Sequence, residues 1–188
     1  MCGRYYVSDD ERLSDMVKRM NRTGSLAVKT GEIRPKDTAP VCVYDGKPVF
    51  AARVWGLRGK DGRLIINARS ESAAEKPLFR ELFAGSRIVV PANAYYEWDS
   101  AKMRHTYAHA AGRMYLAGLQ KGGEFVILTR GAYGSLASVH PRMPVVFTRQ
   151  AALAWLSPAS DPARVLGFAE TGAIFEKPDA PLQLRLDL

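Results

Sequence analysis

The sequence predicts a single α+β domain in which short strands outnumber helices. The chain has 188 residues, 47% of them hydrophobic, which is enough to bury one core. Short apolar segments typical of strands follow one another, with only a few helical patterns between them. Because helices do not alternate regularly with the strands, a doubly wound parallel sheet is disfavoured. We find no repeat, low-complexity stretch or linker, so one domain is expected over residues 1–188.

The first expected elements are a short strand and an amphipathic helix. Gly3 to Val7 has the composition of a strand. Ser8-Asp9-Asp10-Glu11 is typical of a capping box at a helix start. The apolar face of that helix is then formed by Leu13, Met16, Val17 and Met20. The segment 20–24 is expected to end the helix.

A hairpin, two further helices and more strands are expected in the rest of the chain. Asp45-Gly46-Lys47 predicts a hairpin turn between strands at Val41–Tyr44 and Pro48–Val54. Helices are expected over Ser72–Phe83 and Gln150–Leu156. The other expected strands are Leu64–Asn67, Arg87–Val90, Tyr95–Trp98, Tyr107–Ala110, Met114–Leu119 and Phe125–Thr129.

The net charge of +8 is unevenly distributed. Residues 1–150 carry 24 basic and 14 acidic side chains, whereas residues 151–188 carry three and five. A basic body suits a polyanion such as nucleic acid, although the same charge also favours solubility. No apolar run approaches the ~20 residues of a membrane helix, and no signal-peptide pattern is present. Two cysteines form no disulfide framework, so we expect a cytoplasmic protein with Cys42 as a buried core thiol.

Cys2 is the most informative candidate for chemistry. Removal of Met1 would leave a thiol and a free α-amine on one residue, with reference pKa values near ~8.5 and ~8. The amine can condense with an aldehyde to a Schiff base, and the thiol can then close a five-membered thiazolidine ring. Position alone also fits a small apolar residue at a frayed terminus.

Three further segments place polar side chains at strand ends, where functional sites are commonly built. Asn67-Ala68-Arg69-Ser70-Glu71 follows an apolar strand directly. Glu97 lies between two large aromatic residues, which can raise its pKa into a range useful for acid–base chemistry. His140 precedes Pro141-Arg142-Met143-Pro144 and has an unperturbed pKa near neutral pH.

Each of these segments also has a structural interpretation. Glu97 fits a solvent-facing carboxylate in an alternating strand, and His140 fits a structural histidine. Asn67 and Arg69 fit caps of the following helix, and Arg69 with Glu71 fits a surface ion pair. His105 and His109 are four residues apart, but no third ligand is near them in the sequence, so no metal site is predicted.

Together these segments resemble the SRAP domain, the fold of abasic-site processing proteins that crosslink to DNA. The resemblance covers roughly residues 1–150 in the family's order. One departure is Ala92-Asn93-Ala94, where the family usually has Ala-Asp-Gly. The resemblance is carried by Met1-Cys2-Gly3-Arg4-Tyr5, Arg34-Pro35, Thr38-Ala39-Pro40-Val41, Trp55-Gly56-Leu57, Asn67-Ala68-Arg69-Ser70-Glu71, Tyr96-Glu97-Trp98 and His140-Pro141-Arg142-Met143-Pro144.

The resemblance implies antiparallel sheets curled toward a barrel and a covalent reaction with abasic sites in single-stranded DNA, within the SOS response to DNA damage. It implies that Cys2 supplies the amine and thiol, and that Asn67 orients this residue. Glu97 would move protons, and His140 would assist opening of the sugar or hold the deoxyribose and phosphate. Weak lyase activity and crosslink reversal are also implied, with no cofactor or metal.

The expected DNA contacts comprise three arginines, three aromatic residues and a Met-Pro pair. Guanidinium groups bind phosphate oxygens in bidentate fashion, and aromatic rings stack on bases. A lesion held in a concave site requires splayed bases, so single-stranded DNA containing an abasic site is the expected partner of a monomeric protein. The DNA-binding candidates are Arg4, Arg69, Arg142, Trp55, Tyr96, Trp98, Met143 and Pro144.

Two other functions fit the same residues. In a cysteine hydrolase or self-cleaving peptidase, Cys2, His140 and Glu97 would act as nucleophile, base and orienting group. Such an enzyme needs only the thiol, whereas crosslinking needs the thiol and the α-amine on one residue. In a non-catalytic nucleic-acid-binding module, Cys2 would be incidental and Cys2→Ala would change nothing.

Overall fold

The computed structural model describes residues 2–8, 11–23 and 27–177. Within them, short strands outnumber helices and form a five-stranded, an eight-stranded and a two-stranded sheet. The two-stranded sheet is a small excursion, β5 (Leu57–Arg58) paired with β6 (Leu64–Ile65). The α+β prediction is therefore confirmed.

The eight-stranded sheet closes into a ring of strands. Around the ring each strand pairs with the next, and β11 pairs back with β12. The expectation of sheets curled toward a barrel is therefore confirmed. The ring consists of β12 (Glu124–Gly131), β4 (Lys47–Trp55), β3 (Thr38–Asp45), β8 (Arg87–Ala92) and β11 (Met114–Lys121). Attached to it are β7 (Asn67–Arg69), β13 (Arg142–Pro144) and β14 (Val146–Phe147).

The five-stranded sheet lies beside the ring, and all of its pairings are antiparallel. Its strand order is β15 (Ile174–Lys177), β10 (Arg104–His109), β9 (Ala94–Trp98), β1 (Arg4–Val7) and β2 (Gly31–Ile33). Paired residues of neighbouring strands face the same side, so Tyr5, Tyr95 and Tyr107 all point into the core. Arg4 and Tyr96, one residue along, point to the other face.

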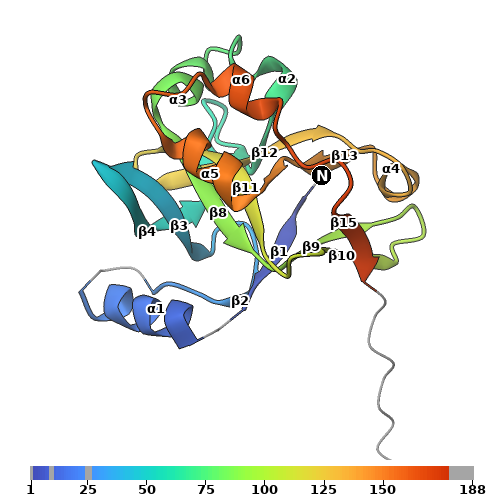
Figure 1. Cartoon of the computed structure of the whole chain (residues 1–188), viewed down its shortest axis with the longest axis horizontal. Coiled ribbons are helices and arrows are strands. Elements are labelled where there is room, and N and C mark those ends of the chain that lie inside the picture. The colour runs from blue at the N-terminus through green and yellow to red at the C-terminus, as the bar shows by residue number, and fades with distance from the viewer. Residues whose placement is uncertain (1, 9–10, 24–26, 178–188) are drawn as a thin grey trace, which may run out of the picture.

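The helices are short and mostly cover one side of the ring. Figure 1 shows α2 (Ser70–Ala73), α3 (Arg80–Gly85), α5 (Arg149–Leu156) and α6 (Pro162–Leu166) gathered together, with α1 (Glu11–Thr23) apart from them near β2. The last helix, α4 (Leu136–Val139), precedes β13. No helix in the described part of the chain is long and apolar enough to span a membrane.

The ring separates two hydrophobic clusters. Along β3, alternate residues Val41 and Val43 join a cluster that also contains Cys2 and Tyr5. Cys42, between them, faces the second cluster, which lies under α3, α5 and α6. Cys42 is only half-buried, so the prediction of a buried core thiol needs correction, because the outer face of β3 is incompletely covered.

One buried arginine fixes the ends of two helices. Arg87, at the start of β8, is 5% exposed. Its Nε donates to Trp155 O at 2.7 Å, and its Nη2 donates to Ser157 O at 2.7 Å, at the end of α5. Its Nη1 donates to Phe83 O and Ala84 O in α3. A cation at two helix C-termini satisfies carbonyls that lack intrahelical partners.

Several predicted elements differ from those observed. The helix predicted over Ser72–Phe83 is two helices, because Pro77 has no amide hydrogen and clashes with the preceding turn. The strand predicted over Leu64–Asn67 is divided between β6 and β7. The hairpin at Gly46 is confirmed, with Asp45 paired to Lys47. Two residues of the predicted capping box, 9 and 10, lie outside the described residues.

Candidate functional site

The site lies at one end of the five-stranded sheet, where β1 begins and β9 ends. Tyr5 pairs with Tyr95 and Arg4 with Tyr96, in antiparallel register. This register brings the chain that leads into β1 beside the last residues of β9. Cys2 and Glu97, which are far apart in the sequence, therefore meet at the same end of the sheet.

The Cys2 thiol is fully buried and protonated. Its exposed fraction is 0%, and its Sγ donates to Arg4 O at 3.7 Å. Burial raises the pKa of Cys2 well above its ordinary value, and the nearby charge of Glu97 raises it further. At neutral pH the side chain is therefore a thiol whose deprotonation requires a nearby base.

Asn67 holds the backbone of Cys2 in place. It begins β7, which pairs in parallel with β12 through the register of Asn67 and Ile127. From there its Nδ2 donates to Cys2 O at 2.9 Å. The Oδ1 atom of Asn67 is buried and has no hydrogen-bond partner among the described residues. An acceptor in this state is available to a donor on Cys2 or on a bound molecule.

Glu97 and His140 belong to the same electrostatic environment as Cys2. Glu97 is only 4% exposed, and its burial raises the pKa of its carboxyl group, while the charge of His140 lowers it. His140 follows α4, and its Nδ1 lies 3.0 Å from both the amide nitrogen and the carbonyl oxygen of Arg142. The backbone before β13 thus fixes the imidazole ring near the carboxylate.

Four tyrosines whose hydroxyl groups are buried surround this group, and none of them was predicted as a site residue. The hydroxyl groups of Tyr5, Tyr95, Tyr107 and Tyr133 have no hydrogen-bond partner among the described residues. Burial raises the pKa of Tyr95, with further contributions from Cys2 and Glu97. Strand alternation was the sequence signal that pointed to buried tyrosines. Neighbouring residues of a strand point to opposite faces, so only one tyrosine of each of the pairs 5–6 and 95–96 can face the core.

Cations and aromatic rings alternate on the outer face of the same sheet. The Arg4 guanidinium lies 4.9 Å from the centroid of the Trp98 ring and also pairs with Glu32 at 3.3 Å. The Arg104 guanidinium lies 5.1 Å from the centroid of the Tyr96 ring. Arg4, Tyr96 and Trp98 were expected at a DNA surface, whereas Arg104 was missed. Its pairing with Trp98 across β9 and β10 could not be inferred before the register was known.

Three expected DNA contacts are buried instead. Trp55 is 0% exposed, donates from Nε1 to Ile66 O at 2.9 Å, and stacks on Phe125 with a centroid distance of 6.2 Å. Met143 and Pro144 are also buried, in β13. Stacking on a base requires an accessible ring face, so the role predicted for Trp55 does not fit this structure. Because the side chains of Met143 and Pro144 are buried, direct contact between them and DNA does not fit this structure either.

The Arg142 guanidinium is bound to other groups of the protein rather than left accessible to a phosphate. Its guanidinium donates to both carboxylate oxygens of Glu71, at 2.7 and 2.8 Å, and to Thr129 O at 2.6 Å. The hydrogen bond from Arg142 lowers the pKa of Glu71 to about 2. The predicted phosphate contact of Arg142 therefore competes with this pair. Arg69 is exposed, and its guanidinium has no hydrogen bond with another described residue.

Neither histidine of the 105–109 pair belongs to a metal-binding cluster in the described part of the chain. His105 lies between two carboxylates, with Nδ1 2.7 Å from Glu176 Oε1 and Nε2 3.3 Å from Asp99 Oδ2. The His109 Nδ1 accepts from Ala111 N at 3.0 Å. Both rings are thus held by side-chain or backbone groups around β10.

Comparison with known proteins decides the family. The SOS response associated peptidase (SRAP) family matches residues 1–174. The chain belongs to the SRAP family. Among its relatives is the abasic site processing protein YobE of Bacillus subtilis, 27% identical over 185 residues, which cover 84% of this chain and 83% of YobE. YedK of Escherichia coli, also named an abasic site processing protein, is 26% identical over 189 residues covering 83% and 79% of the two chains.

Solved structures share the SRAP fold seen here. A protein from Bacteroides thetaiotaomicron superposes with a TM-score of 0.74 at 18% identity, covering 93% of this chain and 90% of that one. A phage-related protein from Bordetella bronchiseptica superposes with a TM-score of 0.70 at 25% identity, covering 95% of both chains. The fold is therefore one that occurs in experimentally determined structures.

The SRAP fold brings together motifs from four distant segments of the chain. Cys2 and Asn67 are joined by a hydrogen bond, and the charge of Glu97 acts on both Cys2 and Tyr95. His140 in turn acts on Glu97. The four residues singled out as catalytic candidates thus form one constellation. It contains a thiol, a buried carboxyl, an imidazole and an amide.

Proposed function

We propose that this protein recognises abasic sites in single-stranded DNA and bonds to them covalently through Cys2. The observation that carries the proposal is the hydrogen bond from Asn67 to the Cys2 backbone, next to the buried carboxyl of Glu97. An N-terminal cysteine held in this way presents its amine and thiol to a single reacting carbon. The names of the relatives, which are abasic site processing proteins, support the same substrate.

The reaction joins both groups of Cys2 to the aldehyde carbon of the ring-opened abasic sugar. The α-amine, freed by removal of Met1, attacks the carbonyl carbon and forms a carbinolamine. Loss of water then gives a Schiff base. The sulfur adds to the same carbon, the carbon–nitrogen double bond becomes single, and the thiol proton moves to the nitrogen. One water molecule is released in total, and no oxidant or reductant is required.

Glu97 is suited to move the protons in these steps. The Cys2 thiol is protonated because it is buried, so closure of the ring needs a base beside the sulfur. The raised pKa of Glu97 brings its carboxyl closer to neutral pH, where it both accepts and returns a proton. The same residue supports reversal of the crosslink by the opposite transfers.

Asn67 and His140 have positioning roles in this proposal. The unsatisfied Oδ1 of Asn67 is an acceptor for the α-amine, while its Nδ2 holds the Cys2 carbonyl. His140 is fixed by the backbone of Arg142 and assists the opening of the sugar ring. A Schiff base also permits β-elimination, so weak lyase activity accompanies crosslinking.

The DNA strand is proposed to cross the outer face of the five-stranded sheet. There, Arg4 and Arg104 alternate with the rings of Trp98 and Tyr96. This arrangement provides charge for phosphates and flat surfaces for splayed bases. The exposed Arg69 supplies a further cation at the end of β7.

The cysteine-hydrolase alternative receives less support from the site. A peptidase nucleophile reacts as a thiolate, and its pKa is usually lowered by its surroundings. Burial and the charge of Glu97 act in the opposite direction on Cys2. This environment favours a thiol that reacts after the amine has already captured the substrate.

The proposal is tested by intact-mass spectrometry of the protein incubated with a single-stranded oligonucleotide that contains one abasic site. The expected species has the mass of the chain without Met1 plus the oligonucleotide minus one water, and it persists after heat and detergent. Cys2→Ala should remove this species. Equal crosslinking by Cys2→Ala, or an active protein that retains Met1, would overturn the mechanism.

A further inference from the structure

Two buried tyrosines of the five-stranded sheet, Tyr95 and Tyr107, face the same side of the sheet as Glu97. Tyr95 on β9 pairs with Tyr107 on β10, and Glu97 follows Tyr95 by two residues on the same strand. Paired residues, and residues two apart on a strand, lie on one face of a sheet. The two tyrosine rings stack with their centroids 5.1 Å apart and their planes inclined at 26°. Their hydroxyl groups therefore extend to the side of the sheet on which Glu97 lies.

Neither of these hydroxyl groups has a hydrogen-bond partner among the described residues. Tyr95 is only 1% exposed and Tyr107 only 2% exposed, so water does not cover them. A buried hydroxyl without a partner costs stability, and most buried polar groups in proteins are hydrogen-bonded. A cost of this kind is typical of functional sites. The two hydroxyls are therefore candidates for contact with a bound molecule.

Both tyrosines are neutral at physiological pH, and Tyr95 lies close to the proposed reacting groups. Burial raises the pKa of Tyr95 well above its ordinary value, with further contributions from Cys2, Tyr107, Glu97 and Tyr133. Burial likewise raises the pKa of Tyr107 to about 12. Each side chain thus keeps its proton and is able both to donate and to accept a hydrogen bond. None of the groups that act on Tyr95 carries a positive charge, so these hydroxyls suit a neutral polar group better than a phosphate.

The ring-opened abasic sugar carries one neutral group of this kind. Its C1 carbon is the aldehyde, its C2 carbon bears only hydrogen, and the oxygens on C3 and C5 are phosphate esters. The hydroxyl on C4 is therefore the only one that remains. C4 is separated from C1 by two carbons, so a sugar that reacts with Cys2 brings this hydroxyl close to the groups around Cys2. In the closed sugar the same oxygen is part of the ring and has no proton to donate.

We propose that Tyr95 and Tyr107 bind the C4 hydroxyl of the ring-opened sugar and thereby distinguish abasic sites from other aldehydes. This inference rests on the proposed function, because that function places the C1 carbon at Cys2. One tyrosine hydroxyl donates to the C4 oxygen, and the other accepts the C4 hydroxyl proton, so no covalent bond changes. A site that hydrogen-bonds a hydroxyl group discriminates against an analogue that lacks it, because its own buried groups then stay unpaired.

The test compares two single-stranded oligonucleotides of one sequence. One contains an abasic site, and the other contains an acyclic aldehyde analogue with hydrogen in place of the C4 hydroxyl. Single-turnover crosslinking rates are measured for wild type, Tyr95→Phe and Tyr107→Phe. Each variant is compared with wild type on the same strand, so the larger fraction of open aldehyde in the analogue cancels. We expect each variant to be about 3- to 10-fold slower on the abasic strand, and within about twofold of wild type on the analogue.

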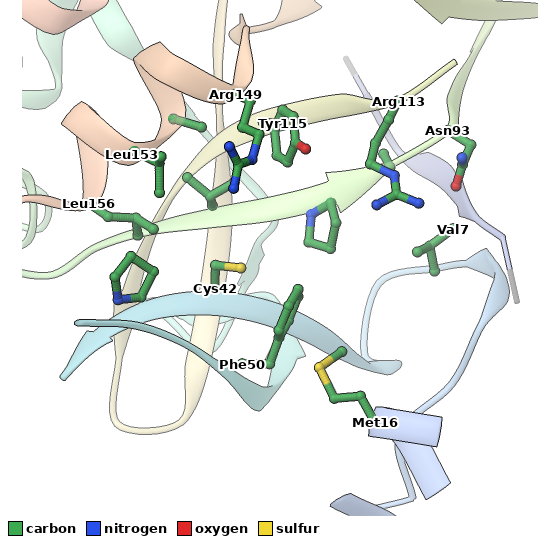
Figure 2. Close-up of a pocket in the computed structure, with 15 residues that line it drawn as sticks. Val7, Met16, Cys42, Phe50, Asn93, Arg113, Tyr115, Arg149, Leu153 and Leu156 are labelled. Carbon is green, nitrogen blue, oxygen red and sulfur yellow. The ribbon is translucent and has the colours of Figure 1, made fainter. Parts of the chain in front are cut away.

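Tyr115→Phe is the matched control. Tyr115 is a half-buried tyrosine of β11 that packs against the second hydrophobic cluster. It lines a pocket of about 440 Å³ on the other side of the ring from Cys2, together with Cys42 and Leu153 (Figure 2). This variant should match wild type on both strands. Since the hydroxyls of Tyr95 and Tyr107 have no partner among the described residues, their Phe variants should unfold at or above the wild-type temperature.

Three outcomes would overturn this inference. Wild-type rates on the abasic strand in both Phe variants would show that the hydroxyls do not contact the sugar. Equal slowing on the two strands would show that they act on Cys2 or on packing rather than on the C4 hydroxyl. Lower unfolding temperatures of both Phe variants would show that the hydroxyls serve the fold. Failure of the proposed function would be seen differently, because wild type would then form no adduct with either strand, and both proposals would be withdrawn.

Discussion

At the scale of single residues, the hydrogen bond from Asn67 holds the backbone of Cys2, the residue that we propose reacts with DNA. Asn67→Asp keeps the size of the side chain but places a carboxylate oxygen against the Cys2 carbonyl, where Nδ2 now donates. Displacement of a reacting group by about 1 Å can cost about 100-fold in rate. We therefore expect single-turnover crosslinking to slow by about 10- to 100-fold, with nearly unchanged affinity for undamaged single strands.

Asn93→Asp is a matched control for this prediction. The Asn93 Nδ2 also donates to a backbone carbonyl, Gly112 O at 3.0 Å, but Asn93 lies near the other end of β1 from Cys2, where its Oδ1 accepts from Ser8 N. The loss of one such donor should affect stability similarly in both variants. If Asn67→Asp crosslinked as fast as Asn93→Asp, Asn67 would have no role in orienting Cys2.

Glu97 should impose a pH dependence on crosslinking. Burial raises the pKa of its carboxyl group, so the base form is lost as the pH falls through a value above the ordinary ~4.3. The wild-type rate should therefore decrease on the acidic side. Glu97→Gln should be slower throughout and lack this acidic limb, as measured by single-turnover rates between about pH 4.5 and 9.

An exposed carboxylate provides the comparison for Glu97. Glu75→Gln should follow the wild-type profile at every pH, since Glu75 lies on the surface. His140→Ala tests the neighbouring imidazole in the same series, and it should slow the steps that open the sugar. Wild-type rates in both Glu97→Gln and His140→Ala would remove these two residues from the proposed mechanism.

Residue identity could be predicted further than residue exposure. The candidates Cys2, Asn67, Glu97 and His140 were identified from motifs, because a motif depends on residue type alone. Trp55 shows the limit, since a tryptophan at the end of a strand is compatible with a surface or a core. Its burial is decided by Tyr5 and Phe125, which approach it from other strands.

At the scale of elements, the Glu71–Arg142 pair fastens α2 to β13. The pKa of Glu71 in the folded protein, about 2, lies below its ordinary value of 4.5. As the pH falls, Glu71 therefore binds a proton in the unfolded chain before it does so in the folded protein. The contribution of the pair to stability is thus fully present above about pH 4.5 and is lost as the pH falls toward 2. Glu71→Gln should lower the unfolding temperature at pH 7, and the difference should vanish near pH 2.

The size of this effect should be small, because the Glu71 side chain is 53% exposed and water screens the pair. Thermal unfolding followed by circular dichroism at several pH values is sufficient to measure it. Glu75→Gln again provides the surface control. A difference between wild type and Glu71→Gln that did not depend on pH would show that ionisation of Glu71 is unimportant.

Arg87 connects β8 to the ends of α3 and α5, so its removal should weaken all three elements. Arg87→Met leaves the carbonyl oxygens of Phe83, Trp155 and Ser157 without their donor in a buried place. We expect a loss of about 2–4 kcal/mol in the free energy of unfolding. Urea denaturation measures this, with the exposed Arg164→Met as the control, and a loss below about 0.5 kcal/mol would contradict the assignment.

Local signals predicted the strands well and the short helices less well. The β3–β4 hairpin was predictable because its turn chemistry and apolar alternation agree. In contrast, the region 72–83 has helical composition on both sides of Pro77. Composition alone does not show that one helix ends before Pro77 and another begins after it. The pairings of β7 with β12 and of β1 with β9 depend on distant segments. No local pattern encodes them.

At the scale of the whole molecule, the positive charge should make DNA binding sensitive to salt. Removing one phosphate contact lowers the magnitude of the log–log salt slope by roughly 0.7 for single strands. Arg69→Ala should show this change, because its guanidinium is exposed. Arg142→Ala should leave the slope nearly unchanged and lower stability instead, because its guanidinium is bound to Glu71.

Titration of an undamaged, fluorescein-labelled single strand at several salt concentrations tests this difference. Arg164→Ala serves as the reference for an exposed arginine that lies on α6, away from the proposed DNA surface. An unchanged slope in Arg69→Ala would remove Arg69 from that surface. A reduced slope in Arg142→Ala would show that its pair with Glu71 opens when DNA binds.

The burial of Cys2 also limits the stage at which Met1 can be removed. β1 lies between β9 and β2, and the residue that leads into it is fully enclosed. Under the proposed mechanism Met1 must be removed before Cys2 can react, because only then is the α-amine of Cys2 free. Cleavage directly in front of an enclosed residue requires local opening of the protein, so we expect Met1 to be removed from the nascent chain, before β1 pairs with β9 and β2. Under the same mechanism, a chain that keeps Met1 forms no thiazolidine.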